Sequence, residues 1–130
     1  MRPYRFFLSP SDYGTELRLY EDPLCRTCLP QLVHATEGTP CEARGFEDYV
    51  FPPFLVTDRG ITLLQWAESL RSPSAVLAMV AEVAELLGTM HRGGIVHRDV
   101  KPANLLLILR TQHWRLLDLG IASRRCASPR

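Results

Sequence analysis

Lysine is almost absent from this chain of 130 residues: Lys101 is the only one, although lysine and arginine together number 15. Aspartate and glutamate number 14, so the formal net charge is +1 at pH 7. A chain without a strong excess of either charge has no overall field that would attract it to nucleic acid or to an anionic membrane surface. We therefore expect neither nucleic acid nor a membrane among its partners.

Long apolar runs are also absent. No uninterrupted apolar stretch approaches the roughly 20 residues that a membrane-spanning helix needs, and the apolar stretch within residues 1–7 is too short for a signal peptide. A hydrophobic content of 46% and a charged content of 22% are typical of a globular chain. The length suits one domain with a sizeable core, and we expect it in the cytoplasm.

Cysteine occurs four times, as Cys25, Cys28, Cys41 and Cys126. Cys25-x-x-Cys28, followed by His34 and Cys41, could supply three thiolates and one imidazole to a zinc ion. A second C-x-x-C pair is missing, and cysteines of a cytoplasmic chain are usually reduced. A small zinc-binding protein therefore stays an alternative, and disulfides are not expected.

Hydrophobic patterns predict helices and strands in irregular succession, and hence an α+β fold. The strongest helical pattern begins at Ser72-Pro73 and ends at Gly93-Gly94, with proline tolerated in the first turn. Two further helices are predicted over 15–20 and 61–70. Strands are predicted over 4–8, the end of 24–33, 49–57, 105–109 and 114–117, with a loop over 37–47 and a turn over 58–60. The residues from 123 onward are predicted to fray.

The octet His97-Arg98-Asp99-Val100-Lys101-Pro102-Ala103-Asn104 carries the most specific chemistry of the chain. It places a carboxylate, an ammonium group and an amide at short intervals on one predicted loop. A second acid, Asp118, follows 14 residues after Asn104 and precedes Leu119-Gly120. Phosphoryl transfer needs such a set: a group that accepts a hydroxyl proton, a cation near the moving phosphate, and ligands for Mg²⁺.

These two stretches resemble the catalytic loop and the metal-binding triplet of the protein kinase family. A lysine two residues after the catalytic acid is similar to the serine/threonine branch. The resemblance implies that Asp99 accepts the substrate's hydroxyl proton and that Lys101 offsets charge on the phosphoryl group. It also implies that Asn104 and Asp118 bind Mg²⁺. The implied cofactors are ATP and Mg²⁺, and the implied partners are ATP and a protein substrate or partner.

The resemblance gives four neighbouring residues structural roles. His97 would pack in the core and support the segment that begins at Asp118, and Arg98 would meet a phosphate on an activation segment. Leu119 replaces the more usual phenylalanine as an apolar packing residue, and Gly120 would allow a tight turn.

The same resemblance implies a nucleotide-binding role for a stretch further upstream. Residues 54–57 are similar to the fifth kinase strand, with Thr57 as gatekeeper and Asp58, Arg59 and Gly60 as the hinge that contacts adenine through its backbone. Leu106 would lie under the adenine ring. A plain core strand followed by a turn would show the same residues, so this alternative stays open.

The start of the chain departs from the family pattern. Residues 4–7 resemble the third strand, with Arg5 at the position of a lysine, and Glu16, or else Glu21, resembles the helix glutamate that pairs with that lysine. Arginine keeps the charge but presents a planar fork on a longer stem instead of a compact ammonium group. We therefore expect a severe loss of activity.

Other parts of the pattern are missing. None of the eight glycines forms a G-x-G-x-x-G loop, and neither the first two strands nor an activation segment with A-P-E is recognisable. We expect a partial domain: a small-lobe remnant over 1–57, a hinge over 58–60, and the start of a helical large lobe over 61–130. Such a partial domain would expose apolar surface.

The first functional hypothesis is a serine/threonine kinase domain that is weak or inactive as this chain. The alternative is a non-catalytic, pseudokinase-like module that binds a nucleotide or a protein.

Overall fold

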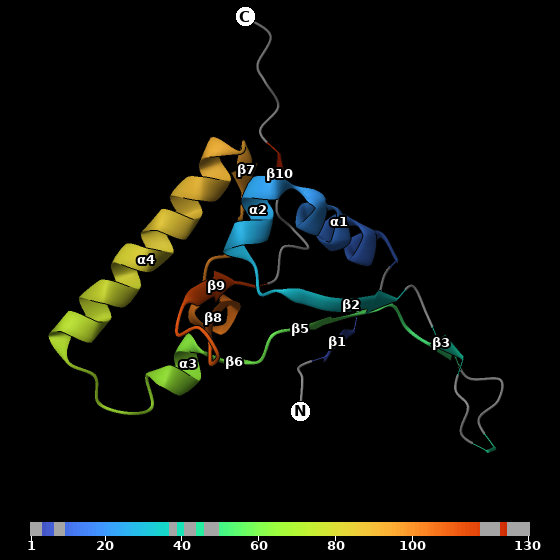
Figure 1. Cartoon of the computed structure of the whole chain (residues 1–130), viewed down its shortest axis with the longest axis horizontal. Coiled ribbons are helices and arrows are strands. Elements are labelled where there is room, and N and C mark those ends of the chain that lie inside the picture. The colour runs from blue at the N-terminus through green and yellow to red at the C-terminus, as the bar shows by residue number, and fades with distance from the viewer. Residues whose placement is uncertain are drawn as a thin grey trace, which may run out of the picture.

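The protein is described by a computed structural model. The described residues are 4–6, 10–36, 39–40, 44–45, 50–117 and 123–124. Figure 1 shows helices and short antiparallel strands, which confirms the expected α+β fold.

The first half of the chain forms a three-stranded antiparallel sheet. Its strands are β1 (Tyr4–Phe6), β5 (Phe54–Thr57) and β2 (Leu32–Thr36), in the order β1-β5-β2. Leu55 and Val56 of the central strand are buried. Of the strand predicted over 4–8, residues 4–6 form β1 and residues 7 and 8 lie outside the described part of the chain. The strand expected at the end of 24–33 forms over Leu32–Thr36.

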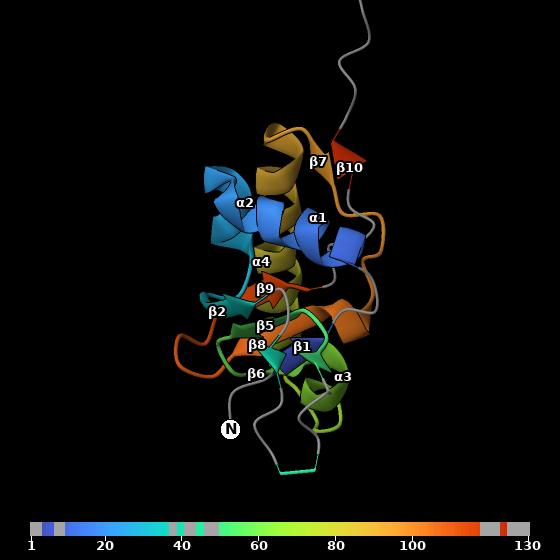
Figure 2. The same cartoon turned by 90° about the vertical axis from the view of Figure 1, so that its right-hand side faces the viewer.

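Two helices lie on the same side of this sheet (Figure 2). Helix α1 (Pro10–Glu21) is longer than the predicted 15–20, and helix α2 (Pro23–Cys28) follows it directly. The Asp22 side chain accepts hydrogen bonds from the backbone N–H groups of Leu24 and Cys25, so it begins α2 as an N-cap residue.

Within the polar stretch after β2 the structure has a strand that the sequence did not predict. A short β3 (Thr39–Pro40) pairs with β4 (Val50–Phe51) within the predicted loop and the predicted strand over 49–57. That strand is therefore two strands in different sheets, β4 and β5, with Pro52-Pro53 between them. Proline has no N–H for a sheet ladder, which accounts for the interruption.

A second three-stranded antiparallel sheet follows residue 59. It has the order β6 (Gly60–Thr62), β8 (Leu105–Ile108), β9 (Trp114–Leu116). The predicted helix over 61–70 is wrong at both ends, because Ile61 and Thr62 pair with β8 and only α3 (Leu63–Trp66) is helical. The side chains of Thr62 and Gln65 form a capping box that begins α3 after the strand.

Helix α4 (Pro73–Arg92) confirms the strongest helical prediction. Ser72 caps its N-terminus by accepting from Ala75 N–H, and Gly93 forms its C-cap. The chain then forms β7 (Ile95–Val96), a loop, and the 3₁₀ turn η1 (Pro102–Asn104) that leads into β8. The segment predicted to fray contributes β10 (Ser123–Arg124), which pairs with β7.

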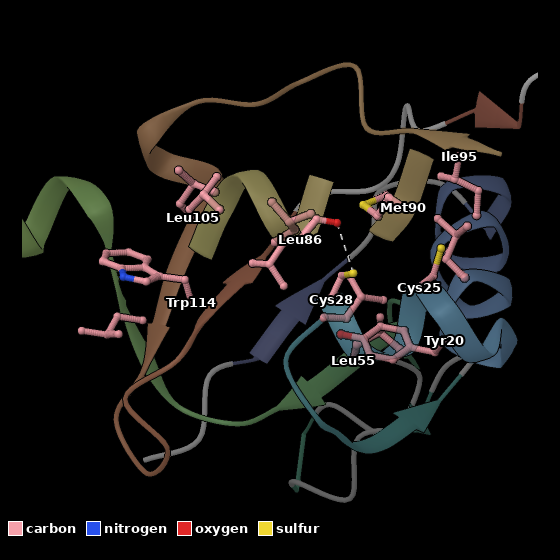
Figure 3. Packing of buried hydrophobic residues seen from close by; sticks show 14 of the residues in the cluster. Tyr20, Cys25, Cys28, Leu55, Leu86, Met90, Ile95, Leu105 and Trp114 are labelled. Atoms are coloured by element: carbon pink, nitrogen blue, oxygen red, sulfur yellow. Dashed lines mark hydrogen bonds between the residues drawn. The ribbon is translucent and has the colours of Figure 1, made fainter. Parts of the chain in front are cut away.

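One hydrophobic cluster joins the two sheets and the helices (Figure 3). Leu55 comes from the first sheet, Leu105 and Trp114 from the second, and Leu86 and Met90 from α4. The division of the chain into 1–57, 58–60 and 61–130 stays a prediction.

The outer side of α3 and α4 exposes apolar side chains, as expected for a partial domain. Figure 1 shows α4 at one side of the molecule, with the other elements on only one of its flanks. The exposed side chains are Leu64, Leu70, Val76, Leu77 and Val80. Two of them, Leu70 and Val76, line an open pocket of about 400 Å³ between α3 and the start of α4.

Helix α4 is also the one helix in the described part of the chain that is long and apolar enough to cross a membrane. This helix was not predicted from the sequence as a candidate span, because that prediction required an uninterrupted apolar run. Glu82 and Glu85 interrupt the run, but the helix is apolar on average. A single helix of this kind is a weak indication of a membrane span. Glu82 instead binds the backbone N–H of Trp114 in β9.

Candidate active site

The predicted catalytic octet forms the connection between β7 and β8. Arg98 adopts a left-handed backbone with φ of 71°, a conformation that costs energy for a residue other than glycine. Pro102 then begins the 3₁₀ turn, and Asn104 N–H donates to the carbonyl of Lys101 at 2.9 Å. The loop therefore curls back on itself before it enters the buried strand β8.

Within this loop, Asn104 and Lys101 both contact Asp99. Asn104 Nδ2 donates to the backbone oxygen of Asp99 at 2.9 Å and to its carboxylate Oδ2 at 3.1 Å. Lys101 Nζ lies 3.4 Å from the same Oδ2. Asn104 is 6% exposed and thus holds the carboxylate from the buried side, whereas Lys101 contacts it from the solvent side with its side chain 53% exposed.

This arrangement has clear chemical consequences. A carboxylate held in this way can accept a proton from a hydroxyl group. The amide hydrogens of Asn104 are directed at Asp99, so its oxygen Oδ1 is the atom left for a cation. An amide oxygen is a ligand that Mg²⁺ accepts, so Asn104 is compatible with the implied ion, whose other implied ligand, Asp118, lies outside the described residues.

His97 supports the loop from inside the core. Its Nδ1 accepts a hydrogen bond from Asp99 N–H at 3.1 Å, so the ring proton is on Nε2, which donates to the carbonyl of Leu117 at 2.7 Å. Leu117 N–H in turn donates to the carbonyl of Asn104 at 2.8 Å. Both backbone groups of Leu117 are thus bound to the octet, and the His97 side chain is 1% exposed. This geometry is the one that a structural role for His97 requires.

Three predicted residues directly after Leu117 fall outside the described part of the chain: Asp118, Leu119 and Gly120. Their roles stay predictions. Arg98 is exposed at the surface of the loop, and its proposed phosphate contact also stays a prediction.

The predicted hinge lies against the second sheet. Thr57 ends β5, and its Oγ1 donates to the carbonyl of Asp58 at 3.4 Å. Leu109 N–H donates to the carbonyl of Arg59 at 3.2 Å, and Gly60 pairs with Ile108.

Leu106 lies on β8 opposite Thr62, so the fold brings it into the same sheet as the segment that follows the hinge. The nucleotide-binding roles of 57–60 and Leu106 stay predictions.

Arg5 lies in the first sheet, and the two candidate glutamates, Glu16 and Glu21, lie in α1. Arg5 pairs with Leu55 in the β1–β5 ladder, one strand away from β2. Glu16 is buried on the face of α1 that also buries Tyr13 and Tyr20, whereas Glu21 is exposed at the end of the helix. Of the two candidate glutamates, Glu16 is the one inside the protein.

The cysteines of the zinc alternative are part of the core. Cys25 and Cys28 are buried thiols in α2, and Cys28 Sγ donates to the carbonyl of Leu86 at 3.4 Å (Figure 3). Burial raises the pKa of the Cys28 thiol above its ordinary value of 9.0, which disfavours the thiolate that zinc needs. Among the described residues no three His, Cys, Asp or Glu side chains are grouped to hold a metal, and Cys41 lies outside them.

Two contacts near the hinge had no signal in the sequence. Arg110 Nη2 bonds Gln31 and Asp58, and Glu82 accepts from His113 and from Trp114 N–H. These partners are between 31 and 79 residues apart, so no local spacing links them.

The sequence model of the protein kinase domain matches residues 56–129. The chain belongs to the protein kinase family. The matched region begins in β5 and contains residues 58–60, α4, the octet and Asp118, and the α+β fold is that of part of a kinase domain. Residues 1–55 precede the match, so the roles of Arg5 and Glu16 rest on resemblance alone.

Serine/threonine kinases of bacteria are among the relatives. Serine/threonine-protein kinase PknB of Mycobacterium tuberculosis is 35% identical over 74 residues, which are 54% of this chain and 12% of PknB. The probable serine/threonine-protein kinase SCO3848 of Streptomyces coelicolor is 40% identical over 83 residues, 58% of this chain and 12% of that protein. Serine/threonine-protein kinase PkaB of the same organism is 56% identical over 58 residues, 39% of this chain and 14% of PkaB. The matched stretch therefore spans a small part of each of these relatives.

Proposed function

We propose that this chain carries the catalytic loop of a serine/threonine protein kinase, which transfers the terminal phosphate of ATP to a protein hydroxyl. The observation that carries the proposal is the pair of contacts on Asp99 Oδ2, from Asn104 Nδ2 at 3.1 Å and from Lys101 Nζ at 3.4 Å. They orient one carboxylate between a buried amide and an exposed cation. The similarity of residues 56–129 to serine/threonine kinases supports the same assignment.

In this proposal each group of the loop has one task. Asp99 accepts the proton of the attacking hydroxyl, and Lys101 stabilises negative charge on the phosphoryl group as it moves. Asn104 keeps the Asp99 carboxylate in place through Nδ2. When Mg²⁺ is bound, it neutralises charge on the phosphates, with Asn104 Oδ1 and Asp118 as its proposed ligands.

We further propose that the 130 residues by themselves transfer phosphate weakly or not at all. Arg5 stands where the family has a lysine, and Lys101 is the only lysine in the chain. A guanidinium group does not reproduce the compact charge of an ammonium group beside a phosphate. A non-catalytic module that binds a nucleotide or a protein is the second candidate, and Arg5 is the observation that favours it. The cytoplasm is the proposed location.

The decisive experiment measures transfer of labelled γ-phosphate from Mg–ATP to a library of serine- and threonine-containing peptides. Four proteins are compared: the wild-type chain, Arg5→Lys, Asp99→Asn, and the double variant. Arg26→Lys in α2 is the control for the arginine-to-lysine change. We expect little transfer by the wild type, more by Arg5→Lys, and none once Asp99 is replaced.

The outcomes separate the candidates. Transfer that persists at the same rate in Asp99→Asn would exclude the proposed role of this carboxylate. Wild-type turnover within the ordinary kinase range of about 1–100 s⁻¹ would contradict the expectation of weak activity. A thermal shift with Mg–ATP but no transfer by any variant would favour the non-catalytic module, and neither a shift nor transfer would reject both.

A further inference from the structure

The hinge is contacted by an arginine from a distant part of the chain. Arg110 follows β8, and its Nη2 lies 3.0 Å from Asp58 Oδ2 and 3.2 Å from Gln31 Oε1. Asp58 is 52 residues and Gln31 is 79 residues away in the sequence. We call Arg110, Asp58 and Gln31 the hinge clamp.

The position of the hinge clamp in the fold is specific. Every strand of the first sheet precedes residue 58 and every strand of the second sheet follows residue 59, so in the described structure residues 58 and 59 are the only covalent link between the two sheets (Figure 1). Gln31 lies directly before β2 of the first sheet, and Arg110 lies shortly after β8 of the second. Arg110, which follows a strand of the second sheet, therefore bonds residues that flank two strands of the first sheet, at the point where the chain crosses between the sheets.

Two backbone hydrogen bonds flank this contact. Asp58 N–H donates to the carbonyl of Gln31 at 3.0 Å, and Leu109 N–H donates to the carbonyl of Arg59 at 3.2 Å. One bond attaches the hinge to the first sheet and the other attaches it to the second. The Arg110 guanidinium group thus adds a side-chain contact at residues 58 and 59, whose backbone already forms hydrogen bonds with Gln31 and Leu109.

We propose that Arg110 is a positioning residue that holds the two sheets at a defined angle and thereby sets the backbone of residues 58–60. The consequence for ligand binding rests on the proposed function, in which this backbone contacts the adenine of ATP. The Asp58 carboxylate, with its side chain 20% exposed, then acts on the nucleotide through Arg110 and not by direct contact. Both contacts are made by Nη2, which carries two N–H groups and can donate to the carboxylate and the amide together.

The expected effect of removing Arg110 follows from the solvent exposure of its side chain. The Arg110 side chain is 66% exposed, and exposed ion pairs contribute little to global stability. Loss of the clamp should therefore open the hinge locally, with amide exchange there about two- to fivefold faster. The chain as a whole should stay folded.

The experiment measures hydrogen exchange of individual amides by NMR in the full 130-residue chain. Arg110→Ala removes the clamp, Arg110→Lys keeps the charge on a shorter side chain, and Asp58→Asn removes the acceptor's charge. Arg92→Ala is the matched control, because Arg92 is an arginine of α4 that bonds Thr89 within its own helix. We expect faster exchange at the amides of Asp58 and Leu109 in Arg110→Ala, a smaller change in Arg110→Lys, and wild-type rates in Arg92→Ala.

Two results would overturn the proposal. The hinge amides could keep their wild-type exchange rates in Arg110→Ala, or the amide of Leu86 inside α4 could accelerate by the same factor, which would mean global destabilisation. Titration with Mg–ADP supplies a second readout, for which we expect about two- to fivefold weaker binding by Arg110→Ala if the hinge opens as estimated. If the wild-type chain does not bind Mg–ADP, the proposed function fails, while the exchange rates still decide the role of Arg110.

Discussion

Gly60 offers the sharpest test of how β6 packs on β8. A Cβ atom built on Gly60 would lie 2.5 Å from the backbone oxygen of Leu107 and 2.6 Å from Cγ of Leu106. Both separations are far inside van der Waals contact, and the Leu107 oxygen belongs to the backbone, so it cannot move aside cheaply. Gly60→Ala must therefore push β6 away from β8 or distort residues 58 and 59, which precede this strand.

The cost can be estimated from measurements on overpacked sites. Inserting a carbon into a tightly packed position typically destabilises a protein by about 1–3 kcal/mol, and we expect Gly60→Ala to fall in this range. Gly88→Ala in α4 is the matched control. Its Cβ would lie 3.5 Å from Arg92 Nη1, the end of a flexible side chain, and replacing glycine within a helix by alanine stabilises by about 0.8–1.0 kcal/mol.

Urea unfolding followed by tryptophan fluorescence measures both variants. Trp66 and Trp114 pack edge to face with ring centroids 5.5 Å apart, next to the sheet that Gly60→Ala disturbs. We expect a lower urea midpoint for Gly60→Ala and a higher one for Gly88→Ala. A Gly60→Ala midpoint at or above that of the wild type would refute the close packing of β6 on β8.

Two further substitutions test the loop and the core. Asn104→Asp replaces the amide donor, which lies 3.1 Å from Asp99 Oδ2, by a second carboxylate. We expect the free energy of unfolding in urea to fall by about 1–3 kcal/mol near neutral pH and by less in acid. An unchanged urea midpoint would contradict the hydrogen bonds described. Burial raises the pKa of the Cys28 thiol, so the folded state favours the protonated form, and the stability present below the ordinary pKa of 9.0 is lost as pH rises beyond it. Between about pH 7.5 and about pH 10 the wild type should therefore lose more stability than Cys28→Val, and equal losses would disprove the effect.

Helices and strands were predicted correctly where the residues that determine them lie in one continuous segment, and wrongly where pairing with a distant strand determines them. Helix α4 was predicted almost to the residue, because its cap Ser72, its apolar periodicity and its terminal Gly93 lie within one continuous segment. The buried strand β8 was also predicted from a continuous apolar run. The helix over 61–70 was wrong, because pairing of Ile61 with Leu107 on β8 overrides the helical tendency of the segment. The Thr62-x-x-Gln65 capping box was visible in the sequence and marked the true start of α3.

For the candidate site, the order of residues in the octet was enough to indicate the kinase family, which the comparison of residues 56–129 shows. The phosphoryl-transfer chemistry that the same residues indicate stays a prediction. The spacing of Asp99, Lys101 and Asn104 is short, and these three do meet in space. This spacing did not indicate that the Asn104 amide and the Lys101 ammonium group would both contact the same oxygen of Asp99. That arrangement depends on the left-handed turn at Arg98 and on the buried position of Asn104, both of which arise only when the loop packs on the core.

Local sequence patterns alone account for the resemblance to the family, the strongest helix and the apolar strand of the second sheet, because each depends on residues close together in the chain. Three-dimensional packing alone accounts for the hinge clamp, for the attachment of Leu117 to His97 and Asn104, and for the burial of Cys28. These contacts join segments up to 79 residues apart. Such contacts depend on how the two sheets and α4 pack around one core, which local sequence spacing does not encode.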